Sequence, residues 1–396
     1  MKKVAITTAV SICNYGTKLQ ALAMCEIFKK RGFVPLVLEF SEGKDITFLQ
    51  KMKHMFGRFI RVILYGKDYQ LKNKFAQEYH NVNFIQKNIM SRYHAVDSDD
   101  YLIPHYRFLG SKKSLIEYAK QFSLAVCGSD QVWHPVLNKK NLWFFTLNFA
   151  PKSAMRIAYA PSLGVDDLTE EQEKEFSSLI SGLDFVSLRE ITGVKAIKKI
   201  TDKPVSLVLD PTLLVGRGLW DKVLNENKVP QNEKYCLCYL LGTNPQHREI
   251  CEIVSKKLGV KLLNFAHFKA YNDSDEKLSG DKLYDVTPSE FIGLIKNAKF
   301  VITDSFHCSV FSMMYHVPFM TLLRFQKADK LSTNARIFSM LQQFGLGNRL
   351  LDNGQKVDTI LSSSIDFDAV ENILISKRKE SNSYLDKALQ NEKINV

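Results

Sequence analysis

Residues 4–40 read VAITTAVSICNYGTKLQALAMCEIFKKRGFVPLVLEF, and this stretch sets the pattern on which the rest of the fold is built. The apolar run at residues 4–10 predicts a buried strand, and a polar turn then leads into a segment with apolar residues at helical spacing. That segment ends at Gly32, a typical helix terminator, and residues 34–40 predict a second strand. Strand, helix and strand in this order form a βαβ unit, which belongs to a parallel sheet.

The same alternation continues through the first half of the chain. Further short apolar segments predict strands at residues 124–127, 156–160, 185–187 and 206–209. We therefore expect a doubly wound, Rossmann-like α/β domain over residues 1–215, with a helical basic insertion at residues 45–120.

A second series of strands and helices begins after a break at Asp210-Pro211-Thr212 and a weakly patterned stretch that ends at Glu233. Its strands are predicted at residues 235–240, 261–265, 300–303 and 319–323. This indicates a second α/β domain over residues 233–365, and a long helical pattern in residues 366–396 that returns to brace the first domain. Two such domains facing each other across a cleft resemble the GT-B arrangement, in which ligands lie at the carboxyl ends of the strands.

Composition agrees with a soluble protein of two domains. The chain has 396 residues, more than one hydrophobic core usually organises, and 45% of them are apolar. The formal net charge of +12 favours anionic partners, such as phosphates, anionic lipids or nucleic acid. The seven cysteines are scattered without a C-x-x-C pair, which predicts neither a disulfide framework nor a zinc site and favours the cytoplasm. No stretch approaches the roughly 18 apolar residues of a membrane-spanning helix.

The most uneven charge distribution lies at residues 48–74, which contain seven basic residues and a single acidic one, Asp68. Apolar residues recur beside the basic ones at helical spacing, as in helices that lie on membrane surfaces. One interpretation is therefore peripheral contact with an anionic membrane, at the inner face of the cell membrane. The other is an ordinary helix packed on the first domain with solvated lysines, and Gly57 and Gly66 weaken a long helix.

Polar residues follow the first predicted strand and form the first candidate site. Asn14, Tyr15, Gly16 and Gln20 stand at the start of a helix, where free amides and the helix dipole favour an anion or a sugar hydroxyl. The alternative interpretation, with equal weight, is an asparagine cap and a turn glycine.

A second candidate set follows residues 124–127. Ser129, Asp130 and Gln131 carry hydroxyl, carboxylate and amide groups that suit the recognition of sugar hydroxyls. The alternative is a capped turn. Trp133 could add a sugar-packing ring, but a position in the core is the favoured interpretation for it.

Arg189 stands at the end of the strand predicted at residues 185–187. Its planar, permanently charged guanidinium suits the binding of a phosphate or a carboxylate. The alternative is an internal salt bridge to Glu190 or to another acid. The position at the edge of a sheet favours the functional interpretation.

The most informative motif is Val301-Ile302-Thr303-Asp304-Ser305-Phe306-His307-Cys308-Ser309-Val310, in which an apolar strand runs directly into a helix. The first turn of that helix carries Asp304, Ser305 and His307, so we expect the imidazole to point into the cleft. A histidine in such a place can exchange protons near neutral pH.

Basic residues follow the strand predicted at residues 319–323. Lys327 and Arg336 are candidates to close over an anion as part of a mobile loop, whereas Arg324 and Lys330 are expected to be solvated.

Five of these segments, in this order and spacing, resemble the polysaccharide pyruvyl transferase family, and the resemblance spans nearly the whole chain. They are Asn14-Tyr15-Gly16 with Leu19-Gln20, Gly128-Ser129-Asp130-Gln131-Val132-Trp133, Ser187-Leu188-Arg189-Glu190, Leu209-Asp210-Pro211-Thr212 and Thr303-Asp304-Ser305-Phe306-His307. Two positions depart from the pattern of some members: Ser305 stands where they have a basic residue, and Cys308 where many have glycine.

The resemblance implies two Rossmann-like domains, phosphoenolpyruvate as the donor and a sugar or lipid-linked oligosaccharide as the acceptor. It implies no metal, no organic cofactor and no nucleic acid partner. By position, Arg189 would bind the donor and His307 would be the acid/base residue, with Asp304 as a third catalytic residue. The expected donor-binding residues are Arg189, Ser305, His307, Lys327 and Arg336, and the expected acceptor-binding residues are Asn14, Tyr15, Gly16, Gln20, Ser129, Asp130 and Gln131.

Two other functions remain as alternatives. A nucleotide-sugar glycosyltransferase with the same two-domain form would need a base and ribose pocket in the second domain, and no decisive signature for one is present. A sugar-binding protein without catalysis would tolerate the loss of His307 and Arg189. The sequence also lacks the Walker, H-E-x-x-H, G-x-S-x-G and kinase motifs.

Overall fold

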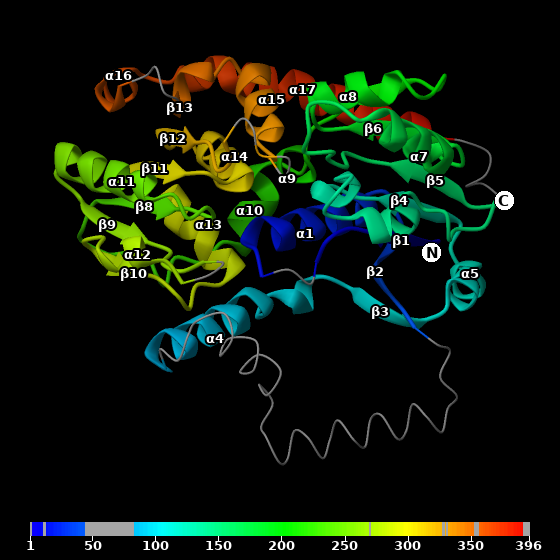
Figure 1. Ribbon diagram of the computed structural model, residues 1–396, viewed down its shortest axis with the longest axis horizontal. Coiled ribbons are helices and arrows are strands. Elements are labelled where there is room, and N and C mark those ends of the chain that lie inside the picture. Colours follow the sequence, from blue (N-terminus) through cyan, green and yellow to red (C-terminus); the bar gives the residue numbers. More distant parts are fainter. Residues whose placement is uncertain are drawn as a thin grey trace, which may run out of the picture.

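The computed structural model describes residues 2–10, 13–43, 83–268, 271–326, 329, 332–351 and 356–390. It contains two α/β domains, each built around one parallel sheet, and the first helix of the chain lies between them (Figure 1). The predicted fold class, two doubly wound domains in a GT-B-like pair, is therefore confirmed. The basic segment at residues 48–74 lies outside the described residues.

The first domain contains a seven-stranded sheet in the order β3-β2-β1-β4-β5-β6-β7. The order reverses between β1 and β4, and in parallel sheets such a reversal opens a crevice at the carboxyl ends of the strands. The strands are β1 (Lys3–Thr7), β2 (Val34–Glu42), β3 (His105–Gly110), β4 (Leu124–Cys127), β5 (Met155–Ala158), β6 (Phe185–Leu188) and β7 (Val205–Leu207). The helices of this part are α1 (Tyr15–Lys29), α4 (Asn83–Asp97), α5 (Lys112–Ala119), α6 (Leu142–Phe145), α7 (Glu170–Ile180) and α8 (Ile191–Lys198).

The second domain contains a six-stranded sheet in the order β10-β9-β8-β11-β12-β13, with its reversal between β8 and β11. The strands are β8 (Tyr235–Tyr239), β9 (Lys261–Asn264), β10 (Asp281–Lys282), β11 (Phe300–Thr303), β12 (Phe319–Leu322) and β13 (Leu350–Leu351). The helices are α11 (Pro245–Leu258), α12 (Asp273–Glu276), α13 (Pro288–Lys296), α14 (Phe306–Met314), α15 (Ala335–Gln343) and α16 (Val357–Ser362). The short helices α9 (Pro211–Leu214) and α10 (Arg217–Val223) join the two domains.

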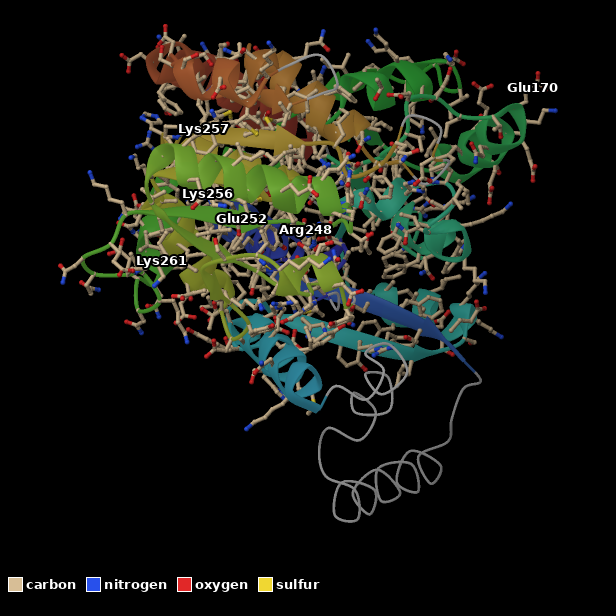
Figure 2. The ribbon with its side chains drawn as sticks, turned by 60° about the vertical axis from the view of Figure 1, so that its left-hand side comes forward. Glu170, Arg248, Glu252, Lys256, Lys257 and Lys261 are labelled. Carbon is tan, nitrogen blue, oxygen red and sulfur yellow. The ribbon has the colours of Figure 1, made fainter. Side chains whose placement is uncertain are left out.

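Local sequence explains why these elements form where they do. Helix α11 begins after Asn244, whose side chain accepts a hydrogen bond from Gln246 N, and it ends at Gly259 in the left-handed conformation. Its outer face carries Glu252 and Lys256 four residues apart, at a separation of 3.9 Å between their charged atoms (Figure 2). Helix α14, by contrast, is buried along its whole length, which explains its apolar sequence.

Strand β3 was not predicted. The sequence suggested a helical insertion up to residue 120, but residues 105–110 pair in parallel with β2 and form the edge of the first sheet. The side chains of β3 are mostly exposed, so the segment lacks the apolar run that marks a buried strand.

The C-terminal helix α17 (Phe367–Leu389) returns to the first domain, as predicted (Figure 1). Ser381 Oγ accepts a hydrogen bond of 2.9 Å from Leu209 N, and Tyr384 Oη donates one of 3.0 Å to Ala158 O. Leu374 and Leu385 are fully buried on the inner face of the helix. The helix therefore packs where the first domain leads into the second.

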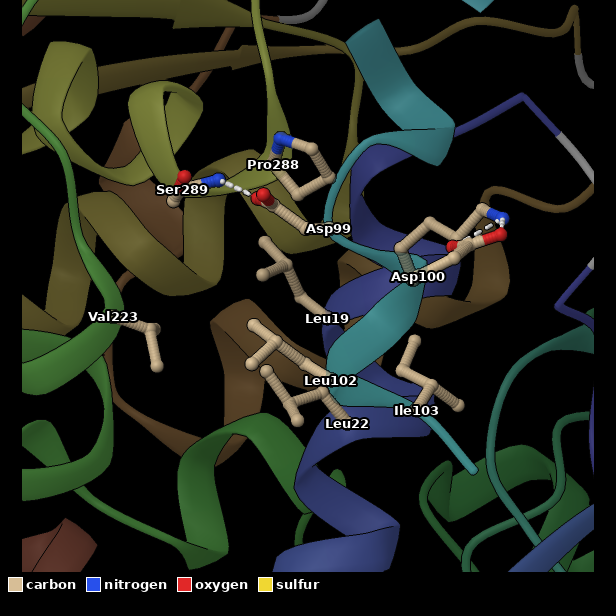
Figure 3. Close-up of a pocket in the computed structure, with 10 residues that line it drawn as sticks. Leu19, Leu22, Asp99, Asp100, Leu102, Ile103, Val223, Pro288 and Ser289 are labelled. Atoms are coloured by element: carbon tan, nitrogen blue, oxygen red, sulfur yellow. Dashed lines mark hydrogen bonds and ion pairs between the residues drawn. The ribbon is translucent and has the colours of Figure 1, made fainter. Parts of the chain in front are cut away.

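The domain interface is tightly packed around α1. Tyr15 is fully buried and its ring stacks on Phe291 of α13, with the centroids 4.6 Å apart. Nearby, Asp99 Oδ2 accepts a hydrogen bond from Ser289 N (Figure 3). Lys18 pairs with Asp100. The contacts of Tyr15 with Phe291 and of Asp99 with Ser289 join the first domain to the second.

Among the described residues, no helix is both long and apolar enough to cross a membrane.

Candidate active site

The predicted site residues come together where the strand ends of the two domains meet. Arg189 and Asp210 follow β6 and β7, Asp130 follows β4, and His307 lies in the first turn of α14. Each of these four residues is at least nine-tenths buried. A cluster of so many ionisable groups is costly to bury unless the charges compensate one another or a ligand.

The Arg189 guanidinium is the centre of the cluster. Its Nη1 donates to Asp210 Oδ2 at 2.5 Å and to Ser129 Oγ at 3.1 Å, and its Nη2 lies 3.5 Å from Asp130 Oδ1. The ring of Phe306 lies against its face, 4.4 Å from Cζ to the centroid. The guanidinium is thus held in one orientation, by a close salt bridge to Asp210 through Nη1 and a longer one to Asp130 through Nη2.

The two carboxylates beside Arg189 are held as anions. Burial would raise the pKa of Asp210, but His307, Arg189 and Thr212 together hold it well below its usual range. The separation of 3.7 Å between His307 Nε2 and Asp210 Oδ2 is too long for a hydrogen bond, so the influence of His307 is charge attraction. The pKa of Asp130 is likewise lowered against its burial, mainly by Arg189.

His307 is positioned by close packing against Gly16. A Cβ atom on Gly16 would lie 2.1 Å from His307 Nδ1 and 2.4 Å from Cγ, so the imidazole occupies the space that any other residue would need. The ring packs on the first helix of the opposite domain.

We expect Gly16→Ala to displace the His307 ring and to lower turnover by about 100-fold, because a shift of about 1 Å at a reacting group has effects of this size. Turnover of the purified variant gives the measurement. Gly218→Ala is the matched control, since a Cβ there meets no atom within 4 Å. Wild-type turnover in Gly16→Ala would show that the position of His307 is unimportant.

Arg336 reaches the site from the second domain on α15. Ser339 Oγ on this helix accepts from Ile191 N, and Gln343 Nε2 donates to Arg189 O, so the helix packs against the loop that carries Arg189. Burial, together with repulsion by Arg189, lowers the pKa of Arg336 to about 9. Two buried guanidinium groups that repel each other indicate a place where an anion would be stabilised.

Asp304 and Ser305 have local partners. The carboxylate oxygens of Asp304 accept hydrogen bonds from Leu241 N and Gly242 N, at 2.8 and 2.7 Å, and Arg324 Nη2 also donates to Asp304 O. Ser305 is the N-cap of α14. Asp304 therefore holds the loop after β8, which suits a positioning residue better than the catalytic role expected from the sequence.

The segment after β1 makes capping, packing and internal hydrogen-bond contacts. Asn14 caps α1 through Thr17 N, and Gln20 Nε2 donates to Thr8 Oγ1 and to two backbone carbonyls. Tyr15 lies in the aromatic cluster between the domains. These contacts correspond to the capping alternative, while Tyr15 Oη and Gln20 Oε1 are buried without a hydrogen-bond partner among the described residues.

Ser129 and Asp130 are also engaged by the protein. Ser129 Oγ donates to Asp210 Oδ2 at 2.7 Å, and Asp130 Oδ2 accepts from Thr17 Oγ1 at 2.8 Å. Both thereby orient Arg189. Trp133 is fully buried and donates to Phe145 O, which confirms its interpretation as a core residue. Lys327 lies outside the described residues.

Three residues near the site were missed or set aside. Arg324 was expected to be solvated, but its side chain is 11% exposed and pairs with Asp304. Phe306 supports Arg189, and His134 lies near Arg336. Only Arg324 had a signal in the sequence, because it follows β12 closely. The roles of Phe306 and His134 depend on contacts between distant segments.

Several buried nitrogen atoms around Arg189 have no hydrogen-bond partner among the described residues. They are Arg189 Nε and Nη2, Gln131 Nε2, His134 Nε2 and His307 Nε2. Buried donors of this kind usually find a partner, and each unsatisfied one costs about 1 to 3 kcal/mol. A set of free donors next to two arginines is an arrangement for an anionic ligand.

Comparison with solved structures supports the fold. A UDP-GlcNAc 2-epimerase from Methanocaldococcus jannaschii is similar at a TM-score of 0.50 and 12% identity, over 96% of this chain and 94% of that one. A putative UDP-N-acetylglucosamine 2-epimerase from Listeria monocytogenes also has a TM-score of 0.50, at 9% identity, over 96% of this chain and 91% of that one. At such identities the likeness shows the fold alone. No curated protein matches the chain significantly.

The family comparison covers most of the sequence. The profile described as polysaccharide pyruvyl transferase matches residues 14–324, from the segment that caps α1 to the arginine after β12. The match includes the cluster of Arg189, Asp210, Asp130 and His307, although Arg336 lies beyond its end. The chain belongs to the polysaccharide pyruvyl transferase family.

Proposed function

We propose that this protein transfers pyruvate as a ketal from phosphoenolpyruvate to a sugar of a cell-surface polysaccharide or of its lipid-linked precursor. The observation that carries the proposal is the convergence of Arg189, Arg336 and His307 where the strand ends of the two domains meet, together with buried nitrogen atoms that have no described hydrogen-bond partner. Membership of a transferase family gives the reaction class. The cluster fits a small, multiply charged donor.

The donor would be held mainly by charge. Arg189 keeps Nε and Nη2 free of described hydrogen-bond partners, so its guanidinium can still bind an oxyanion beside the Asp210 pair. The N-terminus of α14, next to Ser305, adds backbone amides and the positive end of a helix dipole. We propose that these groups bind the phosphate.

His307 would then move the proton that the reaction needs. A proton added to C3 of phosphoenolpyruvate leaves a cation at C2, and a sugar hydroxyl attacks C2 and releases its own proton. The bond between C2 and the phosphate oxygen breaks, and phosphate leaves with the electron pair. A second sugar hydroxyl bonds to C2, loses its proton and closes the ketal. The products are the ketal and hydrogen phosphate, so atoms and charges balance. Asp210, 3.7 Å from Nε2, would stabilise His307 as a cation.

Two other functions would require a different set of groups at the site. A nucleotide-sugar glycosyltransferase has the same fold, and the solved structures of similar fold act on UDP-sugars by their titles. A silent sugar-binding protein would have no need of a constrained acid/base pair. The cluster of hydrogen-bond donors at Arg189 favours phosphoenolpyruvate, a small anionic substrate, over a nucleotide-sugar and over sugar binding without catalysis.

Phosphate release tests the proposal directly. The purified protein is incubated with phosphoenolpyruvate and a panel of acceptor sugars, and inorganic phosphate is measured. We expect release that depends on an acceptor. Release of a nucleotide from a UDP-sugar instead, or no turnover of either donor with any acceptor, would contradict the proposal.

Arg189→Lys should weaken use of phosphoenolpyruvate while the protein stays folded. Lysine keeps the positive charge opposite Asp210 but lacks the planar fork and its fixed donors. We expect the KM for phosphoenolpyruvate to rise by about 10-fold to 100-fold, the size expected for hydrogen bonds to a charged group. An unchanged KM would return Arg189 to the role of an internal salt bridge.

A lipid-linked acceptor would place the protein at a membrane surface. We propose that the basic segment at residues 48–74 supplies the contact, since each basic residue near an anionic leaflet contributes about 1 kcal/mol. Co-sedimentation with anionic liposomes should be strong at low salt and weak at high salt. A variant with Lys51, Lys53, Arg58 and Arg61 changed to Glu should lose it. Equal binding by both proteins would favour the packed-helix alternative.

A further inference from the structure

One ring nitrogen of His134 has hydrogen-bond partners in the protein, and the other has none among the described residues. Nδ1 accepts hydrogen bonds from Val136 N at 3.2 Å and from Leu137 N at 3.1 Å. Because an accepting Nδ1 carries no proton, the proton of the neutral ring is on Nε2. The residue is fully buried, and no described side chain or carbonyl accepts from Nε2. His134 is thus a neutral, prepared donor.

Gln131 presents a second donor of the same kind. Its Nε2 is buried without a partner among the described residues. Gly164 lies beside both donors: a Cβ on it would be 3.1 Å from His134 Cδ2 and 3.4 Å from Gln131 Nε2. Gly164 has a φ of +73°, which favours glycine, and so the backbone passes close to both side chains without a side chain of its own.

Arg336 adds the charge. Thr333 lies at the same place, with its methyl carbon 3.4 Å from the Cβ position of Gly164, and it accepts from Arg336 Nε and Nη2. The third nitrogen, Nη1, takes part in neither of these bonds. Burial and the repulsion of Arg336 lower the pKa of His134 to about 4, so the ring stays neutral at physiological pH.

The nearby protein carboxylates do not satisfy these donors. Glu190 accepts from Ser162 Oγ, Leu163 N and Gly164 N, and Asp130 accepts from Thr17 Oγ1 and Gln131 N. These bonds also hold the loop of Gly164 in place. The remaining groups, one guanidinium and two neutral donors, complement a single negative charge better than a dianion.

We propose that His134, Gln131 and Arg336 form a pocket for the carboxylate of the donor. The inference rests on the proposed function, because it takes phosphoenolpyruvate as that donor. Its phosphate would lie at Arg189 and the start of α14. Gln131, expected from the sequence on the acceptor side, then belongs to the donor side. The pocket explains how the chain holds its donor with Ser305 in place of a basic residue.

The test compares two ligands by isothermal titration calorimetry: phosphoenolpyruvate, and vinyl phosphate, which lacks only the carboxylate. Gln131→Met removes the Nε2 hydrogen-bond donor and keeps the length of the side chain. The Gln131 side chain makes no described hydrogen bond to the protein. His134→Asn keeps an oxygen that can accept from the amides of Val136 and Leu137. We expect each variant to bind phosphoenolpyruvate about 10-fold to 100-fold more weakly, with nearly unchanged binding of vinyl phosphate. Gln246→Met, on the exposed face of α11, is the control.

The outcomes separate the pocket from the proposed function. Equal losses for both ligands, or a loss for vinyl phosphate alone, would overturn the carboxylate assignment, and so would wild-type binding by both variants. If the wild-type protein bound neither ligand, the proposed function would fall together with the pocket. A circular dichroism spectrum like that of the wild type shows that a variant is folded.

Discussion

His307→Gln should lower acceptor-dependent phosphate release by about 100-fold to 10,000-fold, the usual loss when a positioned acid/base group is removed. Glutamine keeps much of the side-chain volume against Gly16 and the polar end near Asp210, but it does not exchange protons near neutral pH. Turnover at saturating phosphoenolpyruvate isolates the proton transfer from donor binding. His307→Ala should show the same loss or a larger one.

A histidine outside the site provides the control for this prediction. His105 lies on the edge strand β3, where it pairs with Glu39 on the protein surface. His105→Gln should retain wild-type turnover. If His307→Gln also retained it, His307 would be a packing residue for Gly16, and the acid/base assignment would be wrong.

Asp210→Asn should destabilise the protein by about 3 kcal/mol, the lower end of the range for breaking a buried ion pair. The variant keeps the side-chain shape but leaves Arg189 without its closest counter-charge, and Asp130 at 3.5 Å compensates only in part. The free energy of unfolding in urea gives the measurement. Asp386→Asn is the matched control, because its pair with Arg31 is exposed on the Asp386 side and should contribute no more than about 1 kcal/mol.

The same pair predicts a dependence on pH. The pKa of Asp210 is held well below its usual range in the folded protein, so its stabilisation is complete above the unfolded pKa of about 4. Below that pH, Asp210 binds a proton in the unfolded state but stays ionised in the folded state. The stability difference between wild type and Asp210→Asn should therefore be constant above about pH 5 and shrink by up to about 1.4 kcal/mol per pH unit below about pH 4. A difference unchanged at pH 3 would contradict the ionised state of Asp210.

The sequence was sufficient for the architecture. The buried strands β1, β4 and β11 are apolar runs with turn residues after them, and these local patterns do not depend on what packs against them. The exposed edge strand β3 lacks such a run, and only its pairing with β2 identifies it. The motifs at the strand ends could likewise be predicted to meet, because parallel strands bring their carboxyl ends to one edge of a sheet.

The role of each site residue was decided by the tertiary structure. Sequence position alone treats Tyr15, Ser129 and Asp304 as equal candidates for ligand contact. In the folded chain, Tyr15 packs between the domains, Ser129 orients Arg189, and Asp304 holds the loop after β8. A residue type limits what bonds a side chain can make, but the partner that takes each bond comes from a distant part of the chain.

The sequence by itself determined the two facing α/β domains, the family and the places of Arg189 and His307. Each of these follows from a short segment of sequence or from the order of such segments. Only the tertiary structure decided which groups remain free. His134 shows the difference: its Nδ1 is used by the next turn of the chain, but whether Nε2 is free depends on Gly164 and Arg336, which packing brings beside it. Free donors are what remain after all internal bonds are made, and they are known only when the whole chain is folded.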